Sequence, residues 1–118
     1  MSTKGAERGG ARFVPLADAD ALEELFKLSH SQPVVLFKHS TTCPISAAAY
    51  QEMSRYGGDI SLLVVQKARE LSRAVETLTG VRHESPQALV LRNGEVVWNA
   101  SHWRVKADEI ARAVLEHE

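Results

Sequence analysis

The sequence predicts a single α/β domain with a four-stranded mixed sheet flanked by helices on both faces. Two observations carry this prediction. Short apolar runs alternate along the chain with segments whose apolar residues recur at helical spacing, which is typical of α/β proteins. The last two apolar runs are separated only by Asn93-Gly94, a strong signal for a tight β-hairpin. A hairpin is antiparallel, whereas strands joined by a helix run parallel, so the sheet is expected to be mixed.

The first expected helix covers residues 18–28. Its apolar residues recur at helical spacing, and acidic residues crowd its start, where the helix dipole favours them. The segment 31–33, which ends in Pro33, terminates it. The first core strand covers residues 34–39, and its continuous apolar run indicates a strand that is covered on both faces.

The middle of the chain predicts a strand–helix–strand unit. A helix follows Cys43 and ends before Gly57-Gly58, and a second buried strand covers residues 61–65. This order implies two parallel strands joined by a right-handed crossover. Residues 66–79 contain the next helix, for which Gly80 is a suitable C-cap residue.

The last third of the chain predicts a loop over residues 81–86, the hairpin strands 87–91 and 95–99, and a closing helix over residues 105–115. No good N-cap side chain marks the start of that helix. Two parallel strands plus a hairpin, with helices between and after them, is the order of the thioredoxin fold. We expect residues 1–12 to be a disordered leader and residues 13–118 to form the domain.

Cys43 is the only cysteine, and it stands between a predicted strand and a predicted helix. A thiol there faces unpaired backbone N–H groups and the positive end of the helix dipole, which favour the nucleophilic thiolate. Pro44 suits the first helical position and so places Cys43 at or just before the N-cap. Ser46 lies one turn further on, where its hydroxyl is expected beside the sulfur as a hydrogen-bond donor. The run from Cys43 to Ser46 therefore looks like a C-x-x-C redox motif whose second sulfur is replaced by oxygen; the alternative is a buried structural cysteine.

Three stretches of the chain resemble one known family. They are Phe-Lys-His-Ser-Thr-Thr-Cys-Pro-Ile-Ser at residues 37–46, His-Glu-Ser-Pro-Gln-Ala at 83–88 and Ala-Ser-His-Trp at 100–103. Together they resemble the YtxJ family of bacillithiol-system redox proteins, the monothiol bacilliredoxins, over residues 15–115. The resemblance implies a thioredoxin-like fold, Cys43 as the catalytic nucleophile with Thr42, Pro44 and Ser46 supporting it, no bound cofactor, and bacillithiol as co-substrate.

Two further pairs of residues are candidates for binding the substrate. In thioredoxin folds a cis proline at the place of Pro86 faces the active-site cysteine, and the residue before it, here Ser85, offers its backbone to an extended substrate. We therefore expect the Ser85-Pro86 bond to be cis. His102 and Trp103 follow the last strand and form either a wall for a sulfur-linked substrate, with His102 as a general acid or base, or a packing tryptophan beside a solvated histidine. The sequence does not decide at which end of the sheet they lie.

Other polar residues have structural interpretations. Lys38 and His39 end the first core strand, and strand alternation puts them on opposite faces, so at most one approaches Cys43. His39 is interpreted as a satisfied core or rim histidine, and His83 and its charged neighbours as solvated loop residues. Ser40 stands where glutaredoxins often carry a lysine, which argues against glutathione-type recognition. No metal site is expected, because one cysteine and scattered histidines form no known ligand spacing.

Composition excludes several classes of function. Charged residues make up 25% of the chain and the net charge is −1, so no overall field attracts nucleic acid or a membrane surface, and neither is an expected partner. The apolar runs are too short to span a bilayer. A lone cysteine cannot form an internal disulfide, which favours a reducing, cytoplasmic compartment.

The sequence therefore favours a cytoplasmic thiol–disulfide oxidoreductase that removes bacillithiol from S-bacillithiolated client proteins through Cys43. A low-molecular-weight thiol or a partner must then regenerate Cys43, since the chain has no resolving cysteine. The alternative is a non-catalytic redox sensor, or a stress-response binding module, in which Cys43 becomes S-thiolated. Multiple turnovers would support the enzyme, and a single stoichiometric burst would support the sensor.

Overall fold

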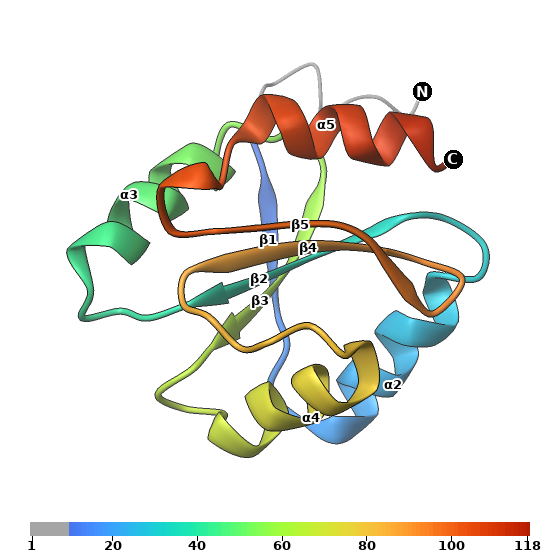
Figure 1. Cartoon of the computed structure of the whole chain (residues 1–118), viewed down its shortest axis with the longest axis horizontal. Helices are drawn as coiled ribbons and strands as arrows, with labels where there is room; N and C mark the ends of the chain where they lie inside the picture. The colour runs from blue at the N-terminus through green and yellow to red at the C-terminus, as the bar shows by residue number, and fades with distance from the viewer. Residues whose placement is uncertain (1–9) are drawn as a thin grey trace.

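The structure of the protein is a computed structural model that describes residues 10–118. Its elements are β1 (Arg12–Pro15), α2 (Ala19–Leu28), β2 (Val34–His39), α3 (Pro44–Met53), β3 (Asp59–Val64), α4 (Arg69–Thr79), β4 (Gln87–Arg92), β5 (Glu95–Ser101), the 3-10 turn η1 (His102–Arg104) and α5 (Ala107–Glu116). The strands form one mixed sheet in the order β1-β3-β2-β4-β5. Helices α3 and α5 lie on one face and α2 and α4 on the other, as Figure 1 shows. The predicted α/β arrangement is confirmed.

The sheet has five strands, so the prediction of four was wrong. The additional strand, β1, pairs in parallel with β3, with Phe13 opposite Ile60. It spans four residues and ends in Pro15, which an edge strand tolerates because one side of its backbone needs no partner. Such a short strand leaves no clear alternation in the sequence. Because β1 begins at Arg12, the expected leader overlaps the domain there, and residues 1–9 lie outside the described part of the chain.

Each face of the sheet has its own apolar core. Leu36 of β2 and Leu63 of β3 pack with α2 and α4, while Phe37 and Ile60 pack with α3 and α5. All four side chains are fully buried. The two central strands are therefore covered on both faces, as their apolar composition predicts.

Local signals in the sequence set most of the element boundaries. Asp18 caps α2 by accepting a hydrogen bond of 2.8 Å from the backbone N–H of Ala21. Gly80 ends α4 in the left-handed conformation, with φ of 73°. Asn93 and Gly94 both have positive φ, 57° and 77°, which the tight hairpin between β4 and β5 requires.

The closing helix α5 begins later than expected, at Ala107, because η1 precedes it. No side chain of its own caps this helix. Instead the backbone N–H of Ala107 donates a hydrogen bond of 2.9 Å to the Glu52 carboxylate of α3. A residue distant in sequence thus satisfies the first turn of α5 and ties together the two helices on this face.

We predict that Glu52→Ala lowers the free energy of unfolding by about 1 kcal/mol, because it removes the acceptor at the start of α5. Urea denaturation followed by circular dichroism measures the change. Glu24→Ala is the matched control, since Glu24 makes only an exposed ion pair of 3.9 Å with Lys27. Equal losses in the two variants would show that Glu52 does not act as a cap.

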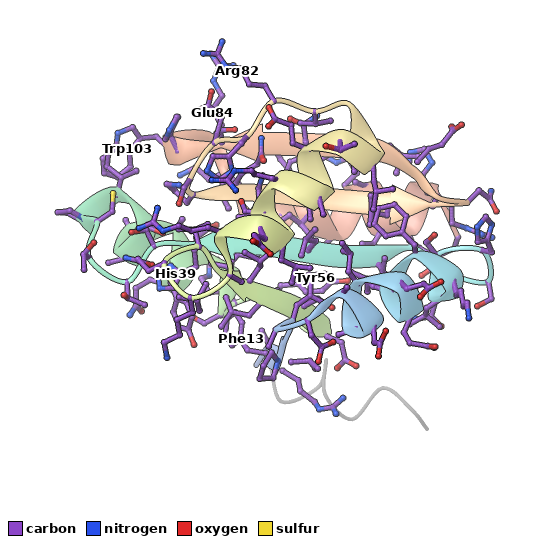
Figure 2. All side chains as sticks on the ribbon, turned by 90° about the horizontal axis from the view of Figure 1, so that it is seen from below. Phe13, His39, Tyr56, Arg82, Glu84 and Trp103 are labelled. Atoms are coloured by element: carbon purple, nitrogen blue, oxygen red, sulfur yellow. The ribbon has the colours of Figure 1, made fainter. Side chains whose placement is uncertain are left out.

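The topology brings several loops to one end of the sheet. The carboxyl end of β2 lies beside the start of β4, with Lys38 opposite Gln87, and Gln87 in turn lies opposite Ser101 at the end of β5. The loop after β2, the loop before β4 and the turn after β5 therefore meet there. Figure 2 shows His39 and Trp103 toward this same end. No helix among residues 10–118 is long and apolar enough to cross a membrane.

Candidate active site

Cys43 is the N-cap residue of α3, with the extended backbone conformation (φ −107°, ψ 124°) that N-caps adopt. Pro44 follows as the first helical residue, as predicted. The thiol is free and partly exposed. Among the described residues, the sulfur makes no capping hydrogen bond to a backbone N–H of the first helical turn, although it lies at the N-terminus of the helix as expected.

Ser46 does not form the hydrogen bond to Cys43 that we expected. Its side chain is fully buried, and its hydroxyl accepts a hydrogen bond of 2.9 Å from the backbone N–H of Ser40. The same oxygen lies 2.8 Å from Nδ1 of His39. The loop that leads to Cys43 folds back over the first turn of α3, and its Ser40 N–H binds this hydroxyl. The helical spacing alone could not show this contact.

His39 is a satisfied rim histidine, as interpreted from the sequence. Its ring packs against Phe37 and Tyr50, with ring centroids 5.6 Å and 5.0 Å away, and Nδ1 faces Ser46. Burial lowers the pKa of the His39 imidazole below its ordinary value and so favours the neutral ring. The contact of this ring with Ser46 holds the end of β2 against the first turn of α3.

Gln66, which the sequence analysis missed, holds the loop before Cys43 from the other side. Its amide nitrogen donates to Ser40 Oγ at 2.9 Å and to Thr42 Oγ1 at 3.1 Å. Its amide oxygen accepts a hydrogen bond of 3.2 Å from the backbone N–H of Thr41. Thr42 is thus held in place by Gln66. Nothing in the sequence indicates this role, because Gln66 follows β3 in an ordinary polar turn.

The Ser85-Pro86 peptide bond is cis, which confirms the prediction. Pro86 is buried, and its carbonyl accepts a hydrogen bond of 2.9 Å from the backbone N–H of His102. The hydroxyl of Ser85 is buried and has no hydrogen-bond partner within residues 10–118. The loop before β4 and the turn after β5 therefore form one continuous surface.

His102 and Trp103 lie at the active-site end of the sheet, because η1 packs against α3 (Figure 1). His102 has φ of 56°, an uncommon conformation outside glycine, and its Nε2 pairs with Glu84 at 3.5 Å. Trp103 is 64% exposed. The packing interpretation of Trp103 is therefore wrong, and this large aromatic side chain is available to a substrate.

Lys38 and His39 point to opposite faces of the sheet, as strand alternation predicts, so only His39 reaches α3. Lys38 is fully buried on the face of α4, and its Nζ lies 3.0 Å from Nδ1 of His83. His83 is exposed, as predicted for a loop residue, but it is not simply solvated, because its ring binds Lys38. Among residues 10–118, no group of three or more His, Cys, Asp or Glu side chains is placed to hold a metal ion.

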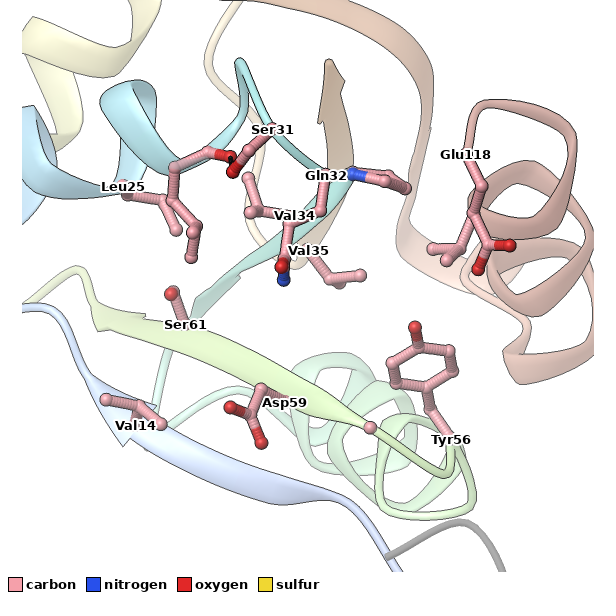
Figure 3. Close-up of a pocket in the computed structure, with 14 residues that line it drawn as sticks. Val14, Leu25, Ser31, Gln32, Val34, Val35, Tyr56, Asp59, Ser61 and Glu118 are labelled. Carbon is pink, nitrogen blue, oxygen red and sulfur yellow. Dashed lines mark hydrogen bonds between the residues drawn. The ribbon is translucent and has the colours of Figure 1, made fainter. Parts of the chain in front are cut away.

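The large hollow in Figure 3 lies at the opposite end of the sheet. Its lining includes Val34 at the start of β2 and Asp59 at the start of β3, whereas Cys43 follows the carboxyl end of β2. None of the predicted site residues lines it. The candidate active site is instead the open surface formed by Cys43, the Ser85-Pro86 loop and η1.

Comparison with known proteins agrees with this site. The family model described as monothiol bacilliredoxin BrxC matches residues 14–110. A solved structure described as a candidate oxidoreductase with a thioredoxin fold is 37% identical, with a TM-score of 0.78 over 90% of this chain and 95% of that one.

More distant solved structures share the fold alone. Schistosoma mansoni thioredoxin is 16% identical, with a TM-score of 0.68 over 91% of this chain and 96% of its own. Thioredoxin f from spinach chloroplast is 20% identical, with a TM-score of 0.64 over 92% and 94%. With a single thiol at a helix N-terminus and a cis proline in the loop before β4, the chain belongs to the monothiol bacilliredoxin family and is a thiol–disulfide oxidoreductase with the thioredoxin fold.

Proposed function

We propose that the protein removes bacillithiol from mixed disulfides with protein cysteines, with Cys43 as its only nucleophile. The observation that carries the proposal is the combination of one free thiol at the N-cap of α3 with a serine, Ser46, one turn later. A site of this kind can exchange a disulfide once but cannot close a disulfide of its own. It suits a substrate in which one half is a small thiol that a second small thiol can remove.

In the first step the Cys43 thiolate attacks the bacillithiol sulfur of the mixed disulfide. A new bond forms between Cys43 and bacillithiol, the old sulfur–sulfur bond breaks, and the client cysteine leaves as a thiolate that takes up a proton from water. The client is reduced and Cys43 is oxidised to a mixed disulfide. Attack in line with the leaving sulfur requires open space at Cys43, which its partial exposure provides.

In the second step another bacillithiol, as its thiolate, attacks the bacillithiol sulfur held on Cys43. This releases the Cys43 thiolate and forms bacillithiol disulfide, so the two electrons that reduce the client come from two molecules of bacillithiol. Ser46 does not take part, because a hydroxyl is not an effective nucleophile here and its oxygen is already bound to Ser40 and faces His39.

The surroundings of Cys43 suit such a substrate. The family resemblance implies bacillithiol as the small thiol, and bacillithiol carries carboxylates. The N-terminus of α3 presents unpaired N–H groups that favour such an anionic group. Trp103 offers an exposed aromatic surface on the turn that packs against α3. The backbone beside the cis Ser85-Pro86 bond offers hydrogen bonds to the client chain.

Turnover distinguishes an enzyme from a sensor. A model protein carrying bacillithiol on one cysteine is mixed with a tenth of its amount of this protein and excess bacillithiol, and both masses are followed. We expect nearly all of the client, about ten molecules per Cys43, to be repaired, and no acceleration by Cys43→Ser over the reaction of bacillithiol alone. Release of one client per Cys43, followed by a stable adduct, would instead show a sensor. A reaction in which free cysteine replaces bacillithiol as the regenerating thiol tests whether the second step is specific for bacillithiol.

A further inference from the structure

A buried lysine links the strand that leads to Cys43 with the loop that leads to Ser85 and Pro86. Lys38 lies in β2, five residues before Cys43, and His83 lies two residues before Ser85. We propose that the hydrogen bond between Lys38 and His83 positions the active site. It holds the Ser85-Pro86 loop against β2, the strand that leads to Cys43, and so sets the affinity for the mixed disulfide. The inference rests on the proposed function only for the identity of the substrate.

The burial of Lys38 has an energetic cost that its local contacts do not offset. The residue is fully buried in the central strand β2, where an apolar side chain would pack without loss. No carboxylate forms an ion pair with it in the described part of the chain. Its single hydrogen-bond partner there is Nδ1 of His83, 3.0 Å away. A buried amine with one partner destabilises the fold, which points to a role outside stability.

His83 is held from three directions. Its ring accepts from Lys38 of β2, and Ser72 Oγ of α4 lies 3.0 Å from the same nitrogen. Its backbone N–H donates a hydrogen bond of 3.1 Å to the Glu76 carboxylate of α4. Ser72 is itself buried. These contacts anchor the middle of the loop that continues directly into the cis Ser85-Pro86 bond.

Further contacts near the Lys38–His83 hydrogen bond fix the same loop to the sheet. Lys38 is paired across the sheet with Gln87, the residue after Pro86, and the Gln87 side chain donates to the Arg82 carbonyl at 3.0 Å. Both ends of the loop are therefore fixed to the sheet, and Lys38 adds the tie at its centre. Without this tie, residues 83–85 would keep only the contacts of His83 with Ser72 and Glu76 of α4 and the surface pair of Glu84 with His102.

The bond requires a neutral imidazole, because protonated His83 has no acceptor at Nδ1. Burial and the Lys38 ammonium lower the pKa of His83, while Glu76 and Glu84 oppose the shift. Arg69 and Arg73 of α4 are the other charged residues nearby, since they line a surface hollow together with His83. The neutral form is thus favoured in the folded protein, and the bond is lost as the pH falls below the ordinary histidine range. Burial lowers the pKa of Lys38 to about 8, yet its neutral amine still donates, so the bond persists above that pH.

The test compares Lys38→Met, His83→Leu and His83→Gln with the parent, and uses His30→Gln as the matched control on an exposed histidine at the hairpin end of the sheet. We expect Lys38→Met and His83→Leu to raise KM for the mixed disulfide roughly fivefold to tenfold at pH 7.5, with kcat unchanged. Glutamine keeps an acceptor for Lys38 but does not titrate. His83→Gln should therefore keep the parent KM at neutral pH and lose the rise in KM that the parent shows on acidification.

Hydrogen exchange tests the same idea without substrate. The amides of residues 83–85 should exchange faster in Lys38→Met and His83→Leu than in the parent, and at the parent rate in His83→Gln. Thermal unfolding of Lys38→Met should occur at the same or a higher temperature, because methionine buries without charge. Unchanged exchange in His83→Leu would overturn the proposal even if the protein acts on another thiol. The expected faster exchange in Lys38→Met and His83→Leu, together with absent turnover of the parent, would reject only the proposed substrate.

Discussion

Replacing Ser46 by cysteine is expected to convert the single-thiol site into one that releases bacillithiol by itself. Cβ atoms three residues apart on a helix lie about 5–6 Å apart, so the first turn of α3 must tighten modestly to reach the roughly 3.5–4.5 Å that a disulfide requires. The new thiol would stand where Ser46 now lies 2.8 Å from His39 Nδ1, so a neutral imidazole is placed to accept its proton. Attack within one chain should release the adduct at least roughly 100-fold faster than in the parent.

The measurement is intact mass over time, after loading with bacillithiol and removal of free thiol. Ala48→Cys is the matched control: it adds one thiol on the exposed side of α3, where it does not face Cys43. The parent and Ala48→Cys should keep the adduct, while Ser46→Cys should lose the mass of one bacillithiol and end two hydrogens lighter than the fully reduced Ser46→Cys variant. If the parent releases its adduct as fast as Ser46→Cys, another resolving group exists and the single-thiol mechanism is wrong.

Trp103→Ala is expected to weaken substrate binding strongly without affecting the fold. Exposed tryptophans at binding surfaces often contribute at least about 2 kcal/mol, which corresponds to a roughly 30-fold rise in KM. Because Trp103 is 64% exposed, its removal leaves no cavity in the core, and the unfolding temperature should stay the same. Steady-state kinetics with a bacillithiolated client and thermal unfolding measure the two quantities.

The second tryptophan of the chain provides the matched control. Trp98 of β5 packs against the core cluster on the α3 and α5 face, so Trp98→Ala should cost about 3 kcal/mol of stability. Its effect on KM should be small at temperatures where the variant is folded. A loss of stability without a change in KM on replacing Trp103 would show that Trp103 packs and does not bind.

Local signals explain why much of the fold could be predicted from the sequence. Gly80, Asn93-Gly94 and Pro44 each act on the backbone of their own turn, so their meaning does not depend on the rest of the chain. The reactive position of Cys43 followed for the same reason, since the strand before it and the proline after it are its neighbours in sequence. The short edge strand β1 was missed because four residues carry too little pattern.

The supporting contacts of the site could not be predicted, because they join residues far apart in sequence. Gln66 lies more than twenty residues from the loop that it holds, and Lys38 lies 45 residues from His83. A side-chain amide or amine in the sequence is compatible with many partners, and only the packed sheet selects one. The same reason explains the error at Ser46: its hydroxyl was assigned to the nearest polar atom along the helix, whereas the returning loop supplies Ser40 and His39 instead.

The placement of the C-terminus has a practical consequence for attaching the protein to a reporter or a surface. Arg12 pairs with Asp59 at the start of β3, and Arg92 at the end of β4 donates to the carbonyl of His117 at 2.9 Å. Both positions lie at the end of the sheet away from Cys43, since β4 runs antiparallel to β2. A fluorescent protein or a solid support joined at the C-terminus therefore leaves the face that carries Cys43 open, and the single thiol means that a thiol-reactive probe labels only this face.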